Sequence, residues 1–147
     1  AYIYHGGGGI CKGGKLKDNM MELDGEMLRM EGLVDFHEAP WVHKYNGKYY
    51  LSYSDNHDEN MNDGVKGDNR MRYAISDSPL GAWKHQGIYM EPTDSYTNHG
   101  SIVEYKGEWF AFYHNSALSN HDWLRSICVD RLYYNEDGTI QMVKQRK

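Results

Sequence analysis

The amino-acid sequence predicts an all-β protein, and more narrowly a partial β-propeller of about two and a half four-stranded antiparallel blades. Three observations support this fold class. Aromatic side chains, which are enriched in strands, make up 14% of the 147 residues. A hairpin pattern occurs twice, and a second pair of predicted strands follows each copy. Repeats of four antiparallel strands, spaced by more than about 40 residues, are typical of propeller blades.

The two hairpins have closely similar sequences. Residues 45–53 read YNGKYYLSY and residues 105–113 read YKGEWFAFY, so the first tyrosine, the glycine and three aromatic positions match. In each copy a two-residue turn, Asn46-Gly47 or Lys106-Gly107, joins an apolar strand to an aromatic one. A turn of this kind is the strongest short-range signal for a β-hairpin.

Two further strands are predicted after each hairpin. They are Arg72–Ser76 and Gly87–Glu91 in the first copy, and Ser126–Leu132 and Thr139–Val143 in the second. We therefore predict a single domain with one full blade over residues 32–92 and another over residues 93–147. The first strand of each hairpin is the innermost strand of its blade and lines the axial channel.

An incomplete blade is predicted over residues 1–31. Its strands are expected at Tyr2–Tyr4, Ile10–Leu16 and Met27–Met30, and residues 16–23 are expected to form a loop or short turn, because a helix there would be under about three turns long. Its innermost strand is absent, so we expect an N-terminal portion to be missing. Because an open propeller exposes sheet edges, we expect either a parent protein of about twice this length or a homo-oligomer that completes the propeller.

Composition and charge argue against several classes of function. Sixteen basic and 21 acidic residues give a net charge of −5 without a Lys/Arg cluster, so no nucleic-acid partner is expected. No apolar run approaches the roughly 20 residues that span a bilayer and no leader opens the chain, so we expect a soluble chain without a membrane partner. Cys11 and Cys128 lack the spacing of a zinc site and leave the redox compartment and location open.

Glu38 is the candidate general acid. It begins the innermost strand of the first full blade, in the stretch FHEAPW at residues 36–41, which places its carboxylate at the channel mouth. Phe36, His37 and Trp41 are close enough in sequence to desolvate the carboxylate and favour its protonated form, as a general acid requires. The alternative is an exposed glutamate ahead of a proline-bounded strand.

Three further residues are candidates for the same channel. His99 occupies nearly the same repeat position as Glu38, where it would hold a water or a metal ion, or make only structural hydrogen bonds. Arg125 could present its guanidinium to sugar hydroxyls or to a carboxylate, or simply pair with an acidic neighbour. Trp41 is a better candidate than Trp109 for stacking on a sugar ring, because Trp109 belongs to the packing positions of the repeat.

Residues 55–69 are rich in Asp, Asn and Gly. Such a composition is superficially that of a calcium loop, but the residues do not have the register of the helix-flanked calcium loop. We predict a solvated insertion that borders the channel.

Five motifs follow one another along the chain: EAPW at 38–41 with YNGKYYL at 45–51, SDSPLGAW at 76–83, HGSI at 99–102, and YNEDGTI at 134–140. Together they resemble glycoside hydrolase family 43 over nearly the whole sequence. The resemblance implies the C-terminal half of a five-bladed β-propeller catalytic domain. It also implies an inverting, exo-acting β-xylosidase or α-L-arabinofuranosidase that acts on xylan or arabinan, with xylo- or arabino-oligosaccharides as substrates.

The resemblance also assigns residues. It implies that Glu38 is the general acid, that His99 is the histidine near the channel centre that often holds a calcium ion or a water, and that Arg125 contacts the sugar. Phe36, His37 and Trp41 are then expected to line the substrate site. No cofactor is expected to be required, and calcium near His99 is an option.

The sequence departs from the family in lacking the general-base Asp and the pKa-tuning Asp, which family members carry ahead of this segment. Inversion needs a base that activates water opposite the acid, so another chain or a missing N-terminal half would have to supply it. Asp35, Asp55 and Asp94 are conceivable substitutes, and their spacing selects none of them.

Two other functions compete with the enzyme. A carbohydrate-binding remnant would keep the aromatic and Arg125 contacts without catalysis. A protein-interaction propeller is compatible with the fold, since fold does not dictate function, but the order of the motifs argues against it.

Overall fold

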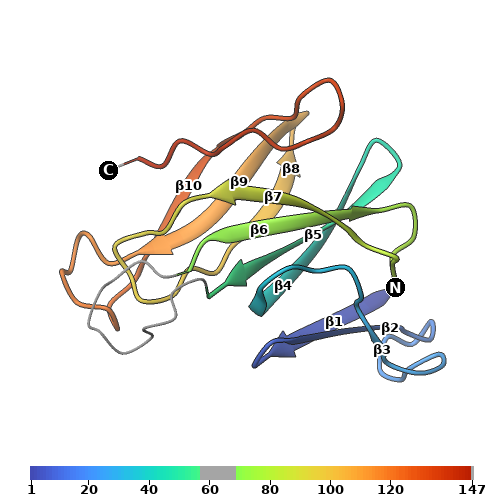
Figure 1. Ribbon diagram of the computed structural model, residues 1–147. Helices are drawn as coiled ribbons and strands as arrows, with labels where there is room; N and C mark the ends of the chain where they lie inside the picture. Colours follow the sequence, from blue (N-terminus) through green and yellow to red (C-terminus); the bar gives the residue numbers. More distant parts are fainter. Residues whose placement is uncertain (57–68, 147) are drawn as a thin grey trace.

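The computed structural model of the chain describes residues 1–56 and 69–146, which form strands and no helix (Figure 1). The loop predicted at residues 55–69 lies largely outside the described residues. No helix that is long and apolar enough to cross a membrane occurs in the described part of the chain. The strands are β1 (Tyr2–Gly7), β2 (Ile10–Lys15), β3 (Leu28–Arg29), β4 (Phe36–Tyr45), β5 (Lys48–Asp55), β6 (Met71–Ser76), β7 (Lys84–Met90), β8 (Ser101–Tyr105), β9 (Glu108–Asn115) and β10 (Ser126–Leu132).

The strands form three antiparallel sheets in chain order. The sheet orders are β1-β2-β3, β4-β5-β6-β7 and β10-β9-β8. Figure 1 shows the three sheets side by side, with the four-stranded sheet between the other two. Strand β4 contacts both β1 and β8, so the first strand of the central sheet lies where all three sheets meet. This arrangement is that of consecutive propeller blades, as predicted.

The predicted hairpin turns are present. Asn46 and Gly47 have φ values of 45° and 79°, and Lys106 and Gly107 have φ values of 53° and 80°. Positive φ at both central residues defines the type I′ turn, which matches the twist of the flanking strands. The closing pairs are Tyr45 with Lys48, and Tyr105 with Glu108.

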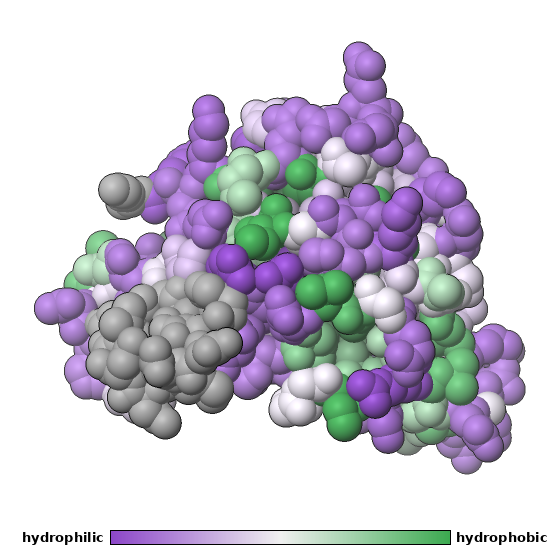
Figure 2. All heavy atoms as spheres, in the orientation of Figure 1, coloured by the Kyte–Doolittle hydropathy of each residue, from purple (hydrophilic) through white to green (hydrophobic). Residues whose placement is uncertain are grey.

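Two apolar clusters lie between neighbouring sheets. The cluster between the first and central sheets contains Cys11, Met30, Leu51, Tyr53, Ala74 and Trp83 among its buried residues. The cluster between the central and last sheets contains Tyr50, Met71, Tyr73, Tyr89, Ile102, Ala111 and Tyr113. Successive residues of the central strands therefore point alternately into one cluster and the other, as in sheet-on-sheet packing. Apolar side chains also remain on the surface over the first sheet (Figure 2), where Ile3, Ile10 and Leu28 are exposed.

One predicted strand is wrong. Residues 139–143 form no strand in the structure, and the segment after the turn at 135–138 makes a single bridge, between Tyr134 and Ile140. The reason is that the segment bonds to the central sheet, because Val143 N donates to Tyr89 O at 2.8 Å. By contrast, the absence of a helix at residues 16–23 is confirmed, and Leu16 bridges to Leu23 there.

Candidate active site

Glu38 lies near the beginning of β4, where the strand is irregular. The pairing of β4 with β5 shifts register between Phe36 and Glu38 and again between Glu38 and Trp41, and Ala39 has a φ of 58°. A residue other than glycine rarely adopts positive φ, and bulges change the direction of a side chain. The local backbone therefore departs from regular pairing on either side of the Glu38 carboxylate.

The Glu38 carboxylate meets two histidines. Its Oε1 lies 2.9 Å from Nε2 of His99, which comes from the segment just before β8, and 4.0 Å from Nε2 of His37. The side chains of Glu38 and His99 are 30% and 44% exposed, so the pair is open to a ligand. A carboxyl and an imidazole at this distance can share one proton, which is what a group that donates and recovers a proton needs. The structure brings the Glu38 and His99 side chains into contact, and their place in a substrate channel stays a prediction.

His114 on β9 is a further member that the sequence analysis missed. Its Nε2 accepts a hydrogen bond from the backbone N–H of His99 at 3.4 Å, and the two rings lie 5.9 Å apart. Burial, with the nearby charges of Arg125 and His99, lowers the pKa of His114 to about 4. The signal that could have found it is the repeat, because His114 is the counterpart of Ser54, the strand partner of Glu38.

The other predicted site residues lie around this pair in different environments. Phe36 is buried and its ring packs on Tyr53 at 5.3 Å, whereas Trp41 is 39% exposed and donates from Nε1 to Ile102 O at 3.0 Å. Arg125 is exposed and its Nε donates to the backbone O of Asp122 at 2.9 Å. Their contacts with a sugar stay predictions.

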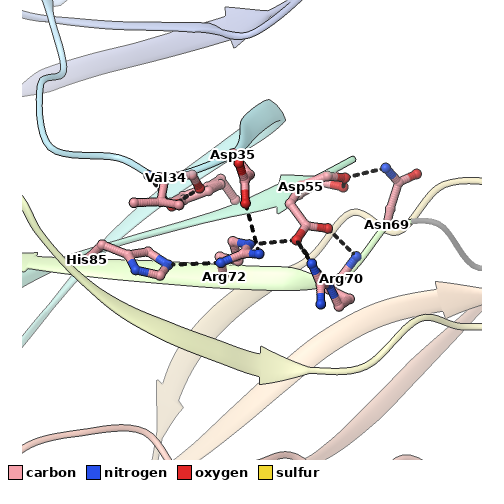
Figure 3. A network of polar contacts seen from close by, with 9 residues as sticks. Val34, Asp35, Asp55, Asn69, Arg70, Arg72 and His85 are labelled. Atoms are coloured by element: carbon pink, nitrogen blue, oxygen red, sulfur yellow. Dashed lines mark hydrogen bonds and ion pairs between the residues drawn. The ribbon is translucent and has the colours of Figure 1, made fainter. Parts of the chain in front are cut away.

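A buried ionic network supports the beginning of β4 (Figure 3). Asp55, whose side chain is 0% exposed, accepts from Nε of Arg70 at 3.1 Å and from Nε of Arg72 at 2.6 Å. Arg72 also pairs through Nη2 with Asp35 at 3.0 Å and through Nη1 with His85 at 3.4 Å. Since Asp35 stands three residues before Glu38, the network links β5 and β6 to the entry of the site strand.

The three aspartates that could replace the general base, Asp35, Asp55 and Asp94, have other contacts in the structure. Asp35 and Asp55 both engage the Arg72 guanidinium, which favours a structural part for these carboxylates. Asp94 accepts a hydrogen bond at its backbone O from Ser116 Oγ at 2.7 Å. None of these contacts identifies one of the three carboxylates as the general base opposite Glu38.

The residues around His99 do not by themselves fit calcium. Within residues 1–56 and 69–146, no three His, Cys, Asp or Glu side chains are grouped so that they could hold a metal ion. Calcium takes about six to eight oxygen ligands, whereas His99 presents a nitrogen that Glu38 already engages. Calcium at His99 stays a prediction.

Comparison with known proteins identifies the class. The family described as glycosyl hydrolases family 43 matches residues 2–140. A β-xylosidase of Xylanibacter ruminicola is 46% identical over 111 residues, which cover 74% of this chain and 31% of that protein. A xylosidase/arabinosidase of Bacteroides ovatus is 43% identical over 107 residues, which cover 71% of this chain and 30% of that protein.

Solved structures agree. A family 43 β-xylosidase/α-arabinofuranosidase from a compost microbial metagenome, solved in complex with xylotriose, superposes with a TM-score of 0.83 at 29% identity. The match covers 96% of this chain and 53% of that one. The three blade-like sheets and the match along the chain thus place it in a class of proteins, the glycoside hydrolases of one family, that have a propeller fold.

The chain belongs to glycosyl hydrolases family 43. It spans about a third of the length of these curated relatives and about half of the solved chain. It therefore corresponds to part of a five-bladed propeller, as the sequence motifs predicted.

Proposed function

We propose that this chain carries the general-acid half of a glycosidase site that hydrolyses xylosidic or arabinofuranosidic bonds with inversion. The observation that supports the proposal is the contact of 2.9 Å between Glu38 Oε1, near the beginning of β4, and His99 Nε2, just before β8. The relatives named β-xylosidase and xylosidase/arabinosidase support the substrate class.

In the proposed reaction, Glu38 donates its proton to the oxygen of the leaving group as the glycosidic C–O bond breaks. Water attacks the anomeric carbon from the opposite face, and its proton passes to a base outside the described residues. His99 holds the Glu38 carboxyl in place and accepts a hydrogen bond from it, or donates one to it, as the proton moves. His37 and Arg125 are proposed to contact the sugar.

The base is proposed to come from another chain or from a protein segment outside residues 1–147. Inverting enzymes hold their two carboxyl groups roughly 6.5 to 9.5 Å apart. The segment that carries the general base must therefore approach the Glu38 end of β4. A homo-oligomer that completes the ring is one way to bring such a carboxylate there.

The experiment compares leaving groups in Glu38→Gln, made in the homo-oligomer or longer chain that supplies the base. Removing a general acid should slow hydrolysis of xylobiose by at least about 100-fold and hydrolysis of dinitrophenyl β-xyloside much less, because a good leaving group needs little protonation. The matched control is Glu31→Gln, which removes an exposed carboxylate that pairs with Arg29. Equal losses on both substrates, or none, would contradict the role of Glu38.

A second candidate function is a carbohydrate-binding remnant. It is favoured by the ionic pairing of Asp35 and Asp55, which leaves Glu38 without an evident carboxylate partner among the described residues. In that case the unaltered chain would bind xylo-oligosaccharides in calorimetry without hydrolysing them, and Glu38→Gln would bind them nearly as well.

A further inference from the structure

Two residues with a left-handed backbone conformation stand on either side of Glu38. Asp35 and Ala39 have φ values of 53° and 58°, and neither is a glycine. Residues other than glycine keep such a conformation only where the surrounding contacts hold it, and they cluster at functional sites. The direction of the Glu38 side chain therefore depends on the contacts that hold these two neighbours.

The conformation of Asp35 is held through the residue before it and through its own side chain. The hydroxyl of Tyr53 on β5 accepts a hydrogen bond from Val34 N at 3.1 Å and donates one to Val34 O at 2.8 Å. Oδ2 of Asp35 pairs with Nη2 of Arg72 on β6 at 3.0 Å. The segment that leads into β4 is thus fixed to two neighbouring strands of the central sheet.

Arg72 is itself fixed from the interior of the sheet. Its side chain is 11% exposed, and its Nε donates at 2.6 Å to Oδ2 of Asp55, whose side chain is 0% exposed. Figure 3 shows the side chains of Asp35 and Asp55 both pointing toward that of Arg72. The planar guanidinium therefore holds the two carboxylates through different nitrogens in a fixed geometry. Asp35, which is 53% exposed, is the outer end of this chain of ion pairs.

The contact between Glu38 and His99 is sensitive to the backbone at Asp35. Glu38 stands three residues after Asp35, so a change of φ at Asp35 rotates the backbone that follows and moves the Glu38 carboxylate. Its Oε1 lies 2.9 Å from Nε2 of His99, and a displacement of about 1 Å brings this contact beyond hydrogen-bonding distance. A misplacement of about 1 Å can cost a catalytic group about 100-fold in rate.

We propose that Asp35 is a positioning residue for the general acid. Its ion pair with Arg72 holds the left-handed conformation ahead of β4, and this conformation directs the Glu38 carboxylate toward His99. Asp35 acts through Glu38 and does not itself touch the sugar. The catalytic consequence rests on the proposed function, whereas the placement of the Glu38 carboxylate against His99 does not.

The first measurement is the nitrogen NMR resonance of His99 Nε2 in the 147-residue chain, taken at one pH for all variants. Glu38→Gln gives the reference shift for loss of the carboxylate. Asp35→Ala disfavours positive φ and removes the ion pair, whereas Asp35→Asn tolerates positive φ and keeps an oxygen that accepts from Arg72. Asp35→Ala should reproduce at least about half of the reference shift, and Asp35→Asn only a small part of it.

The second measurement is hydrolysis by the homo-oligomer or longer chain that supplies the base. In Asp35→Ala, kcat for xylobiose should fall by at least about tenfold, with KM nearly unchanged and kcat for dinitrophenyl β-xyloside lowered by less than about threefold. Asp35→Asn should restore kcat for xylobiose to within about threefold of the unaltered enzyme. The matched control is Asp77→Ala, which removes an exposed carboxylate that pairs with Lys48, and it should change neither measurement.

An unchanged His99 resonance in folded Asp35→Ala overturns the proposal, and so do equal losses on the two substrates, which a merely structural residue would give. If Glu38→Gln itself shows no dependence on the leaving group, the proposed function fails, and the His99 resonance alone decides whether Asp35 positions Glu38. Slow exchange of the amide of Leu51, a residue with 0% exposure, reports that a variant is folded. If Asp35→Ala does not fold, Asp35→Gly replaces it, because glycine adopts positive φ freely and removes the ion pair alone. The same shift is expected there, and its absence overturns the proposal.

Discussion

His43 on β4 is a buried imidazole that gives the fold a pH dependence. Its Nε2 lies 2.7 Å from the hydroxyl of Tyr134 and its ring stacks on Tyr50 at 5.0 Å. Its Nδ1 has no hydrogen-bond partner among the residues that the structure describes. Burial lowers the pKa of His43 from 6.5 to about 3. Between these pH values the unfolded chain therefore binds a proton at His43 that the folded chain does not bind. The contribution of neutral His43 to the free energy of unfolding is fully present above pH 6.5 and is lost as the pH falls from 6.5 towards 3.

We expect the free energy of unfolding to fall by about 1 kcal/mol per pH unit in this window on account of His43. Urea unfolding at a series of pH values measures it. In His43→Phe, which keeps the ring and removes the proton site, the slope between pH 6 and 4 should become shallower. A slope that does not change would mean that the acid sensitivity arises elsewhere, for example at His114.

Arg72 is the residue whose loss should harm the buried ionic network most. Arg72→Met leaves Asp55 with Arg70 as its remaining arginine and leaves Asp35 without the ion pair of 3.0 Å. Removing one partner of a buried pair costs more than the pair contributes, so we expect a loss of roughly 3 kcal/mol in denaturant unfolding. Arg29→Met, which breaks an exposed pair with Glu31, should change stability by less than about 0.5 kcal/mol. Similar effects of the two substitutions would contradict a structural part for the network.

At the scale of elements, the sequence predicted what depends on short-range pattern. The turns at Asn46-Gly47 and Lys106-Gly107 and the aromatic strands beside them follow from local chemistry, and they are where the sequence places them. The strand predicted at residues 139–143 failed because a tertiary hydrogen bond, Val143 to Tyr89, holds this segment against the central sheet. His114 was missed for a related reason, since its place beside His99 depends on a tertiary contact of β9 with the His99 backbone.

Gly32 tests the connection that leads from the first sheet into β4. It has a φ of 90°, and a Cβ there would lie 2.0 Å from the backbone O of Trp83, which packs in the cluster between the first and central sheets. Because that obstacle is backbone, Gly32→Ala should cost roughly 3 kcal/mol or more. Gly107→Ala is the matched control, with a φ of 80° and no atom within 4 Å of the added Cβ, and should cost about 1 kcal/mol. Equal losses in thermal unfolding would assign the whole effect to backbone strain.

At the scale of the whole molecule, the last sheet presents an apolar face. The corresponding face of the central sheet is covered by a neighbouring sheet. Tyr50 on β5 is 1% exposed beneath the last sheet, but its counterpart Phe110 on β9 is only partly buried, and Phe112, Val129 and Ile127 on the same face are 37%, 42% and 83% exposed. Water-exposed apolar sheet faces of this kind favour association.

We therefore expect light scattering to give a mass above 17.1 kDa that rises with concentration. The double substitution Ile127→Lys/Val129→Lys should lower that mass and leave the denaturant midpoint nearly unchanged, because the altered side chains face water in the single chain. Met21→Lys, at a position that is 86% exposed in the loop after β2, should leave the mass as it was. A single-chain mass at every concentration would mean that copies of this chain do not complete the propeller, and the base opposite Glu38 would then have to come from a different polypeptide segment.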